Sequence, residues 1–171
     1  MKEETFSLQT MLSTLYKIKN NKAKKRLIFD QAPIGGIGSQ WVKAFFISLP
    51  IILYIGIFNP KIFAMLGIAQ AIIFYIVFLS MIMIMIAGLT FINNNKVMRQ
   101  IAPSWNKLFP SVELTQVLSS GTTPYKDFLK SYNRLLSMDL DDKELETKMK
   151  ENFQHMQEEN KEIYEMMTNR R

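Results

Sequence analysis

The stretch that decides the fold is residues 41–92, which read WVKAFFISLPIILYIGIFNPKIFAMLGIAQAIIFYIVFLSMIMIMIAGLTFI. Beyond its first three residues, Lys61 is its only charged residue. A bilayer core is crossed by about 20 predominantly apolar helical residues, so this stretch is too long for one span. Asn59 and Pro60 divide it at a point typical of a turn. The sequence therefore predicts an all-α membrane protein with a two-helix transmembrane hairpin, one span on each side of this turn.

The two predicted spans differ in length. The first, about residues 42–58, is short for a span, and Pro50 within it removes a helical hydrogen bond and predicts a kink. A re-entrant or interfacial hairpin is therefore an alternative for this half. The second, about residues 62–92, is longer than a span needs, so we expect it to tilt or to continue beyond the lipid as a helix. A soluble core of two helices is a further alternative, but the second run has no polar face to turn to water.

Basic residues predict the orientation. Before residue 44 there are eight Lys or Arg against three Asp or Glu, and from residue 93 onward there are twelve of each sign. Segments rich in Lys and Arg stay on the cytoplasmic side. We therefore expect a multi-pass protein of the cell membrane with both termini in the cytoplasm and Pro60 outside. Trp41 and Trp105 are candidate aromatic residues at the membrane interface.

The composition argues against an enzyme. The chain has no Cys and one His, so neither thiolate chemistry nor a multi-His metal site is available within it. That residue, His155, stands between Glu151 and Glu159, which is typical of a solvated helix face. The predicted spans contain no Asp, Glu, Arg or His, whereas transporters and proton relays place such groups at membrane depth. We therefore predict no enzymatic activity, no cofactor and no metal.

Gln70 is the most informative polar residue of the spans. Its amide needs hydrogen-bond partners in hydrocarbon, so it is a candidate helix-packing residue. The alternative places it near the interface, where it reaches headgroups or water. Gly67 and Ala71 form one pair of small residues at helical spacing, which favours close packing of a neighbouring helix.

Residues 1–40 are predicted to form a basic amphipathic helix followed by a glycine-containing linker. The apolar residues of this arm follow the spacing of one helical face, and Ser7 or Thr5 can cap the helix. The positions on that face are Leu8, Met11, Leu12, Leu15 and Tyr16. Gly35, Gly36 and Gly38 lack the lysine and the strand of a phosphate-binding loop. A flexible connection between arm and membrane is the simpler interpretation.

A basic run follows the apolar face of the arm. An apolar stripe joined to a cationic patch favours an anionic membrane surface, so the run is a candidate lipid-binding site. Its residues are Lys17, Lys19, Lys22, Lys24, Lys25 and Arg26. The same run can serve as a topology signal alone. Nucleic acid is not an expected partner, because no recognition motif or aromatic platform accompanies the charges.

The remainder of the chain is predicted to be a juxtamembrane transition, residues 93–124, and a cytoplasmic helical region, residues 125–171. A short helix is expected within residues 111–119. Thr123 is expected to cap a helix that ends near Met138. Asp141 with Glu144 resembles a capping box and is expected to start the last helix.

The last helix carries its apolar residues at steps of four and three if Asn160 is included, which is the spacing of a coiled coil. Its methionines suit an adaptable partner surface. The candidate partner-binding residues are Met149, Phe153, Met156, Ile163 and Met167. The alternative is an amphipathic helix that packs on residues 125–138 of its own chain.

These features favour a non-enzymatic structural subunit of a larger membrane complex, with membrane lipid and other protein subunits as partners. The layout is similar to that of small inner-membrane subunits of Gram-positive conjugation systems, and secretion machines contain subunits of the same arrangement. Abundant Ile, Lys and Asn are typical of an AT-rich, bacterial genome. The alternative function is a pore-forming, holin-like homo-oligomer that self-associates through its spans. The long carboxy-terminal region argues against that alternative.

Overall fold

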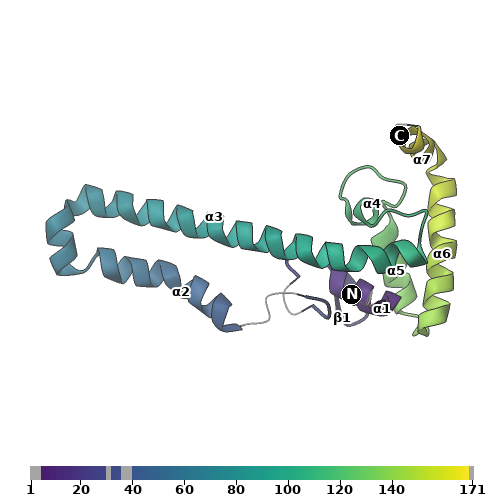
Figure 1. Cartoon of the computed structure of the whole chain (residues 1–171), viewed down its shortest axis with the longest axis horizontal. Helices are drawn as coiled ribbons and strands as arrows, with labels where there is room; N and C mark the ends of the chain where they lie inside the picture. Colours follow the sequence, from purple (N-terminus) through teal and green to yellow (C-terminus); the bar gives the residue numbers. More distant parts are fainter. Residues whose placement is uncertain (1–4, 30–31, 36–39, 170–171) are drawn as a thin grey trace.

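The computed structural model describes residues 5–29, 32–35 and 40–169. The chain is mostly helical and has two parts (Figure 1). A long pair of antiparallel helices, α2 and α3, projects from one side of a domain. That domain contains both the beginning and the end of the described chain.

Helices α2 (Gln40–Ile57) and α3 (Pro60–Leu108) meet at the predicted turn. The Asn59 side chain caps α3 by accepting a hydrogen bond from the Lys61 N–H at 3.1 Å, and Pro60 occupies the first turn. Gly67 has a φ of 73° and ψ of 166°, so it separates a short tip from the long remainder of α3. A Cβ at Gly67 would meet nothing within 4 Å, so this glycine makes a bend rather than a close helix contact.

The two long helices contact each other through aromatic rings and a small residue. The ring of Tyr75 lies 6.3 Å from that of Tyr54 and 6.2 Å from that of Phe58. Ala71 has no exposed area. Of the pair of small residues, Ala71 is therefore the one that is packed.

Most of the remaining hairpin surface is apolar and uncovered. Of the described helices, α3 alone is long and apolar enough to cross a membrane, and 6% of its most apolar stretch is buried. The core helix of a soluble protein would be mostly covered, so this exposure disfavours the soluble alternative. Ala44–Ile57 of α2 forms a shorter apolar helix.

The expected continuation of the second apolar run as a helix is confirmed. Helix α3 extends sixteen residues past Ile92, to Leu108. Val97, Ile101 and Trp105 follow at four-residue steps and have no exposed area. One face of the same helix therefore changes from an exposed apolar surface to the core of the domain.

The predicted amino-terminal helix is present as α1 (Leu8–Leu15), and the Ser7 side chain caps it. Its apolar face is buried in the protein: Leu8, Met11, Leu12 and Leu15 are at most 3% exposed. The backbone N–H of Phe6 also donates to the Ser104 hydroxyl at 3.1 Å. The helix is therefore part of the domain core, and its apolar face is not available to lipid in this fold.

The basic run is not helical, which corrects the all-α prediction. Strands β1 (Tyr16–Lys19) and β2 (Lys22–Lys25) form an antiparallel hairpin. Asn20 and Asn21 both have positive φ, 51° and 54°, as a two-residue hairpin turn requires. Asparagine tolerates this conformation better than most residues.

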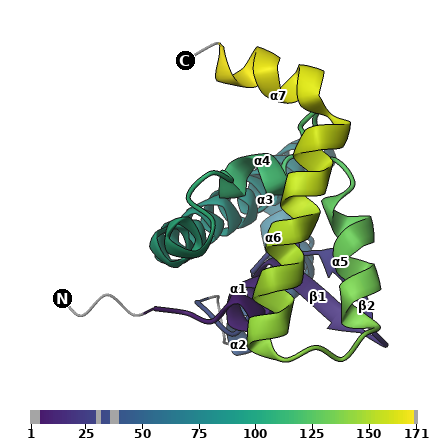
Figure 2. The same ribbon diagram turned by 90° about the vertical axis from the view of Figure 1, so that its right-hand side faces the viewer.

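The other helices of the domain are α4 (Leu114–Leu118), α5 (Phe128–Leu136), α6 (Asp142–Glu159) and α7 (Lys161–Thr168). Asp141 caps α6 as predicted, with its carboxylate accepting from the Glu144 N–H at 2.7 Å. The Thr123 hydroxyl accepts from the Tyr125 N–H at 3.2 Å, but regular helix begins only at Phe128. Figure 2 shows α6 crossing the end of the domain with α5 beside it.

The predicted partner face of the last helix lies largely inside the domain. Phe153 is 2% exposed, and its ring lies 5.2 Å from that of Phe109 and 5.4 Å from that of Tyr125. Met149 and Met156 are 0% and 4% exposed. Because their area is buried against their own chain, these three residues are core residues rather than a docking surface. Ile163 and Met167 are half-buried on α7, and their partner role stays a prediction.

The predicted coiled-coil register is also corrected. Asn160 ends α6 with φ −115° and ψ 36°, so the expected core position is a break between two helices. Its side-chain amide donates to the Met156 carbonyl at 2.9 Å. The heptad spacing therefore does not continue along one helix.

Substitution of Phe153 tests this packing. Phe153→Asp is expected to destabilise the domain by more than about 3 kcal/mol, because it removes a buried ring and buries a charge. Thermal unfolding of the detergent-solubilised chain by circular dichroism measures the loss. Met166→Asp is the control, since Met166 is 63% exposed on α7 and its substitution should change stability by less than about 0.5 kcal/mol. Equal stability of the two variants would show that Phe153 is not a core residue.

Candidate functional site

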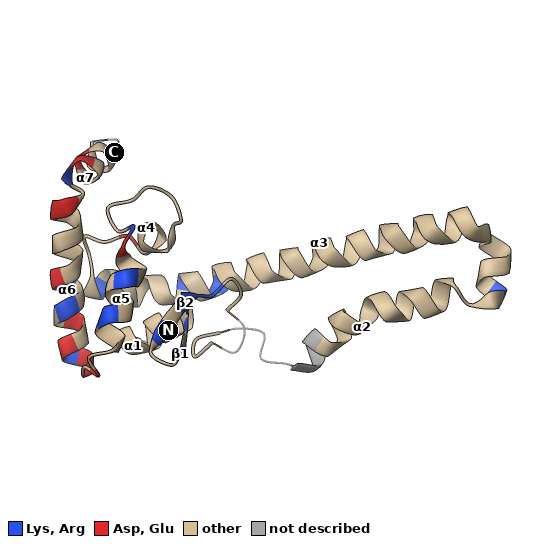
Figure 3. Cartoon of the chain, turned by 180° about the vertical axis from the view of Figure 1, so that it is seen from behind, with Lys and Arg blue, Asp and Glu red and all other residues tan. Residues whose placement is uncertain are grey.

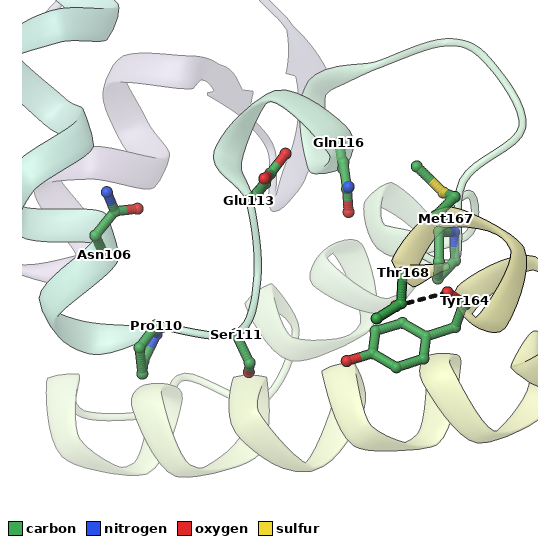
Figure 4. Close-up of a pocket in the computed structure, with 9 residues that line it drawn as sticks. Asn106, Pro110, Ser111, Glu113, Gln116, Tyr164, Met167 and Thr168 are labelled. Carbon is green, nitrogen blue, oxygen red and sulfur yellow. Dashed lines mark hydrogen bonds between the residues drawn. The ribbon is translucent and has the colours of Figure 1, made fainter. Parts of the chain in front are cut away.

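The domain offers two surface features of note, and neither has the arrangement of an active site. Within the described part of the chain, no three His, Asp or Glu side chains are grouped as metal ligands would be. The larger concavity, about 520 Å³, lies where the loop after α3 faces α4 and α7 (Figure 4). Glu113 and Tyr164 are the titratable side chains of its lining, and they come from opposite walls. Its lining brings together no nucleophile and base.

The second feature is the outer face of the β-hairpin. Lys17 stands opposite Lys24 and Lys19 stands opposite Lys22. Because side chains alternate along a strand, these four lysines share one face, here called the lysine face. The four side chains are exposed and, with Asn20, line a concavity of about 440 Å³.

The opposite face of the hairpin holds it on the domain. The Tyr16 ring lies 5.9 Å from that of Phe128 and 5.7 Å from that of Tyr132. The backbone N–H of Ala23 donates to the Asn133 amide oxygen at 2.6 Å, and the Asn133 amide donates back to the Ala23 carbonyl at 3.5 Å. This reciprocal pair fixes β2 on α5.

The hairpin divides the six basic residues predicted to bind lipid. Four form the lysine face. The Lys25 ammonium group instead donates to the Leu118 carbonyl. Arg26 is half-buried, and its backbone N–H donates to the Leu15 carbonyl at 3.0 Å. Their lipid-binding role stays a prediction, but Lys25 and Arg26 are turned toward the domain.

Charge is distributed unevenly over the domain. Figure 3 shows the basic β2 on the side from which the apolar part of α3 leaves, and the acidic residues of α6 at the opposite end. Two lysines of α6 are paired, Lys148 with Glu151 at 3.1 Å and Lys150 with Glu146 at 2.6 Å. None of the ion pairs between described residues includes a member of the lysine face.

The base of the long hairpin is closed by Asn94. Its amide oxygen accepts from the Phe29 N–H at 3.2 Å, and its amide N–H donates to the Leu27 carbonyl at 2.7 Å. Gly35 packs beside it with φ +66°, and a Cβ there would lie 2.7 Å from a methyl group of Val97. The chain on its way to α2 is thus tied to the chain returning in α3. Gly36 and Gly38 of the predicted linker lie outside the described residues.

The remaining sequence-predicted residues are placed as follows. Trp105 has no exposed area, and its indole N–H donates to the Val112 carbonyl at 2.8 Å. It is a core residue, which corrects its assignment to the membrane interface. Trp41 starts α2, but its side chain lies outside the described part. Gln70 is exposed on α3, and no hydrogen bond of its side chain joins it to another described residue.

The tyrosines beneath the lysine face are held in their neutral form. Burial raises the pKa of Tyr132 to about 12. Burial also raises the pKa of Tyr16, and the neighbouring Tyr132 phenol raises it further. A buried phenolate would lack solvation, so ionisation of these rings opposes docking of the hairpin.

An alkaline titration tests this arrangement. Unfolded tyrosine ionises near pH 10, whereas Tyr132 in the fold stays protonated until about pH 12. The contribution of the buried, protonated Tyr132 to the free energy of unfolding is therefore fully present below pH 10. It is lost as the pH rises toward 12. Between pH 10 and pH 12 the free energy of unfolding of Tyr132→Phe should fall by roughly 2 kcal/mol less than that of the wild type.

The measurement is urea unfolding of both proteins from pH 8 to pH 12. Lysine titration is common to the two chains and cancels in the difference. Parallel stability profiles would contradict the burial of Tyr132.

Comparison of the chain with protein-family models, with curated proteins and with solved structures finds no significant match. The function is therefore inferred from the geometry of the chain itself.

The lysine face has a sequence signal that the helical interpretation overlooked. Residues 16–24 read YKIKNNKAK, in which apolar and basic residues alternate on both sides of Asn-Asn. Alternation with a period of two around a pair of turn residues is typical of a β-hairpin.

Proposed function

We propose that the chain is a non-enzymatic structural subunit of a membrane complex, anchored by a helical hairpin that leaves and re-enters the cytoplasm. One observation carries the proposal. Residues on both sides of the apolar hairpin, from Leu8 to Phe29 and from Val97 to Met156, belong to a single hydrophobic cluster. A chain that packs with itself before and after an apolar excursion begins and ends on the same side of the membrane.

The length of α3 fits this arrangement, and α2 is the shorter of the two helices. The apolar part of α3 after Gly67 has 25 residues and is about 37 Å long, which exceeds the roughly 30 Å of a bilayer core. Helix α2, with 18 residues, is about 27 Å long. Its apolar part, Ala44–Ile57, is about 21 Å long, so α2 is shorter than the apolar part of α3 and crosses the bilayer core only with its polar first turn or where the bilayer thins. In this proposal the short tip before Gly67 lies at the outer surface. The basic residues before residue 44 favour the cytoplasm for the domain.

The surfaces of the domain favour a scaffold over a catalyst. One open concavity of about 480 Å³ gathers Asp127, Ser131 and His155 with further charged side chains, but His155 is 70% exposed and its ion-pair partner is Glu159 on the same helix. The aromatic rings of the domain serve its own core. On the analogy of layout, a secretion or conjugative-transfer machine is the class of assembly we propose.

Cysteine labelling tests the topology, because the chain has no native cysteine. Lys61→Cys, at the exposed tip, is expected to react with a membrane-impermeant maleimide in intact cells. Thr5→Cys and Asn169→Cys, both exposed at the ends of the domain, are expected to react only after permeabilisation. Labelling of one terminus but not the other in intact cells would contradict the hairpin.

Purification in mild detergent tests the assembly. A structural subunit is expected to co-purify with different proteins in fixed proportion. The competing function, a pore-forming homo-oligomer, has one observation in its favour: the exposed Gln70, which a second copy can bond across helices. A pure homo-oligomer that releases dye from liposomes, and loses this activity in Gln70→Leu, would contradict the proposal.

A further inference from the structure

The lysine face is an arrangement that the fold alone does not favour. Like charges directly opposite each other on neighbouring strands destabilise a hairpin. Here two such pairs, Lys17 with Lys24 and Lys19 with Lys22, lie side by side. Cβ atoms of opposite residues are about 5 Å apart, and residues two apart along a strand are about 7 Å apart. The four side chains therefore leave the hairpin from a patch of roughly 5 Å by 7 Å.

The hairpin is nevertheless fixed rigidly on the domain. It is held by the Tyr16 ring, which packs against the stacked rings of Phe128 and Tyr132, and by the reciprocal hydrogen bonds of the Ala23 backbone with Asn133. The turn that joins the strands uses two residues in the left-handed conformation. Separation of the strands therefore does not relieve the mutual repulsion, whereas an anion bound at this face would reduce it.

The position of the lysine face on the domain indicates which kind of anion it can meet. The hairpin lies on the side of the domain from which α3 leaves toward its apolar part (Figure 3). The next basic residues, Lys96 and Arg99, are exposed on α3 immediately after the apolar stretch. If the apolar hairpin is in the bilayer, these cations face the headgroups of the same leaflet, where each is attracted to anionic lipid.

We propose that the lysine face binds the phosphate groups of anionic lipid headgroups and holds the domain flat against the cytoplasmic leaflet. This inference rests on the proposed function, because it requires the hairpin in the membrane. It differs from insertion of an amphipathic arm, since the apolar face of α1 is buried in the domain core. The contact is electrostatic, directed through Lys17, Lys19, Lys22 and Lys24, and therefore sensitive to salt.

Lysine acylation of the full-length protein in nanodiscs tests the proposal. One set of discs contains phosphatidylcholine alone, and the other contains phosphatidylcholine and phosphatidylglycerol in equal parts. Mass spectrometry measures the acylation rate of each lysine. The four lysines are expected to react about fivefold more slowly in the anionic discs, and high salt should remove the difference. Lys143 and Lys148, exposed on α6 at the far end of the domain, are the controls and should react equally in both.

Equal rates for the four lysines in both discs would overturn the inference. So would equal protection of Lys143 and Lys148, which would show a general effect of the anionic surface. Two further arms use neutral discs with added duplex DNA or with pyrophosphate. If either protects the four lysines where phosphatidylglycerol does not, the face binds nucleic acid or free phosphate and the lipid assignment is wrong.

A variant with all four lysines replaced by Gln separates binding from folding. In neutral discs its melting temperature is expected to equal or exceed that of the wild type, because the like-charge pairs are gone. In anionic discs the wild type should gain stability and the variant should not. A variant that responds to anionic lipid as the wild type does would overturn the role of these lysines.

Failure of the proposed function and failure of the lipid contact give different results. To separate them, membranes that contain the protein are first extracted at alkaline pH, which releases proteins that are not inserted. A chain released from the membrane would contradict the hairpin anchor. A chain that stays inserted but leaves the four lysines unprotected would contradict the lysine face alone.

Discussion

The contact between α1 and the end of α3 is the interaction on which the rest of the structure depends. Met11, Leu12 and Leu15 are at most 1% exposed, and they share one core with Val97 and Ile101 of α3. A fully buried side chain of this size contributes about 1.5–3 kcal/mol. Because these residues stand on opposite sides of the apolar hairpin in sequence, the contact constrains both ends of the hairpin at once. Asn94 adds hydrogen bonds at the same junction.

This constraint connects the fold to the charges. Burial of α1 places the chain that follows it on α5, with the Tyr16 ring against the stacked rings of Phe128 and Tyr132. The strand that begins at Tyr16 must then direct every second residue outward, and those residues are lysines. The basic face beside the apolar hairpin is thus a geometric consequence of the core.

The sequence predicted the parts that depend on local rules. The turn at Asn59 and Pro60, the cap at Asp141 and the helix at Leu8–Leu15 follow from composition and spacing, and each is present. The membrane assignment rests on the same uncharged run in sequence and structure. The sequence pattern did not predict which apolar faces pack together over long range. An apolar helical face has the same pattern whether it meets lipid, a partner or its own chain, so α1, Trp105 and Phe153 were assigned to surfaces although they form the core.

The lysine face was missed for a different reason. Residues 16–24 alternate with a period of two, but basic residues dominate the segment, and a basic run next to an apolar helix is also typical of an amphipathic arm. Asn160 shows the converse error, since a spacing that fitted a heptad ended at a residue whose side chain closes the helix. In both cases the polar residues at turns and helix ends carried the decisive information.

A cysteine pair between the two ends of the chain tests most directly the central claim that residues before and after the apolar hairpin build one domain. Ala23→Cys with Asn133→Cys joins the amino-terminal hairpin to α5 across residues whose backbone and side chain are 2.6 Å apart. Oxidation in isolated membranes is expected to give an intrachain disulfide, seen as a faster-migrating band that reductant removes. Lys61→Cys with Asn133→Cys, at opposite ends of the molecule, is the control and should give none. Absence of the intrachain product in the first pair, or a product only between chains, would contradict a domain built from both ends of one polypeptide.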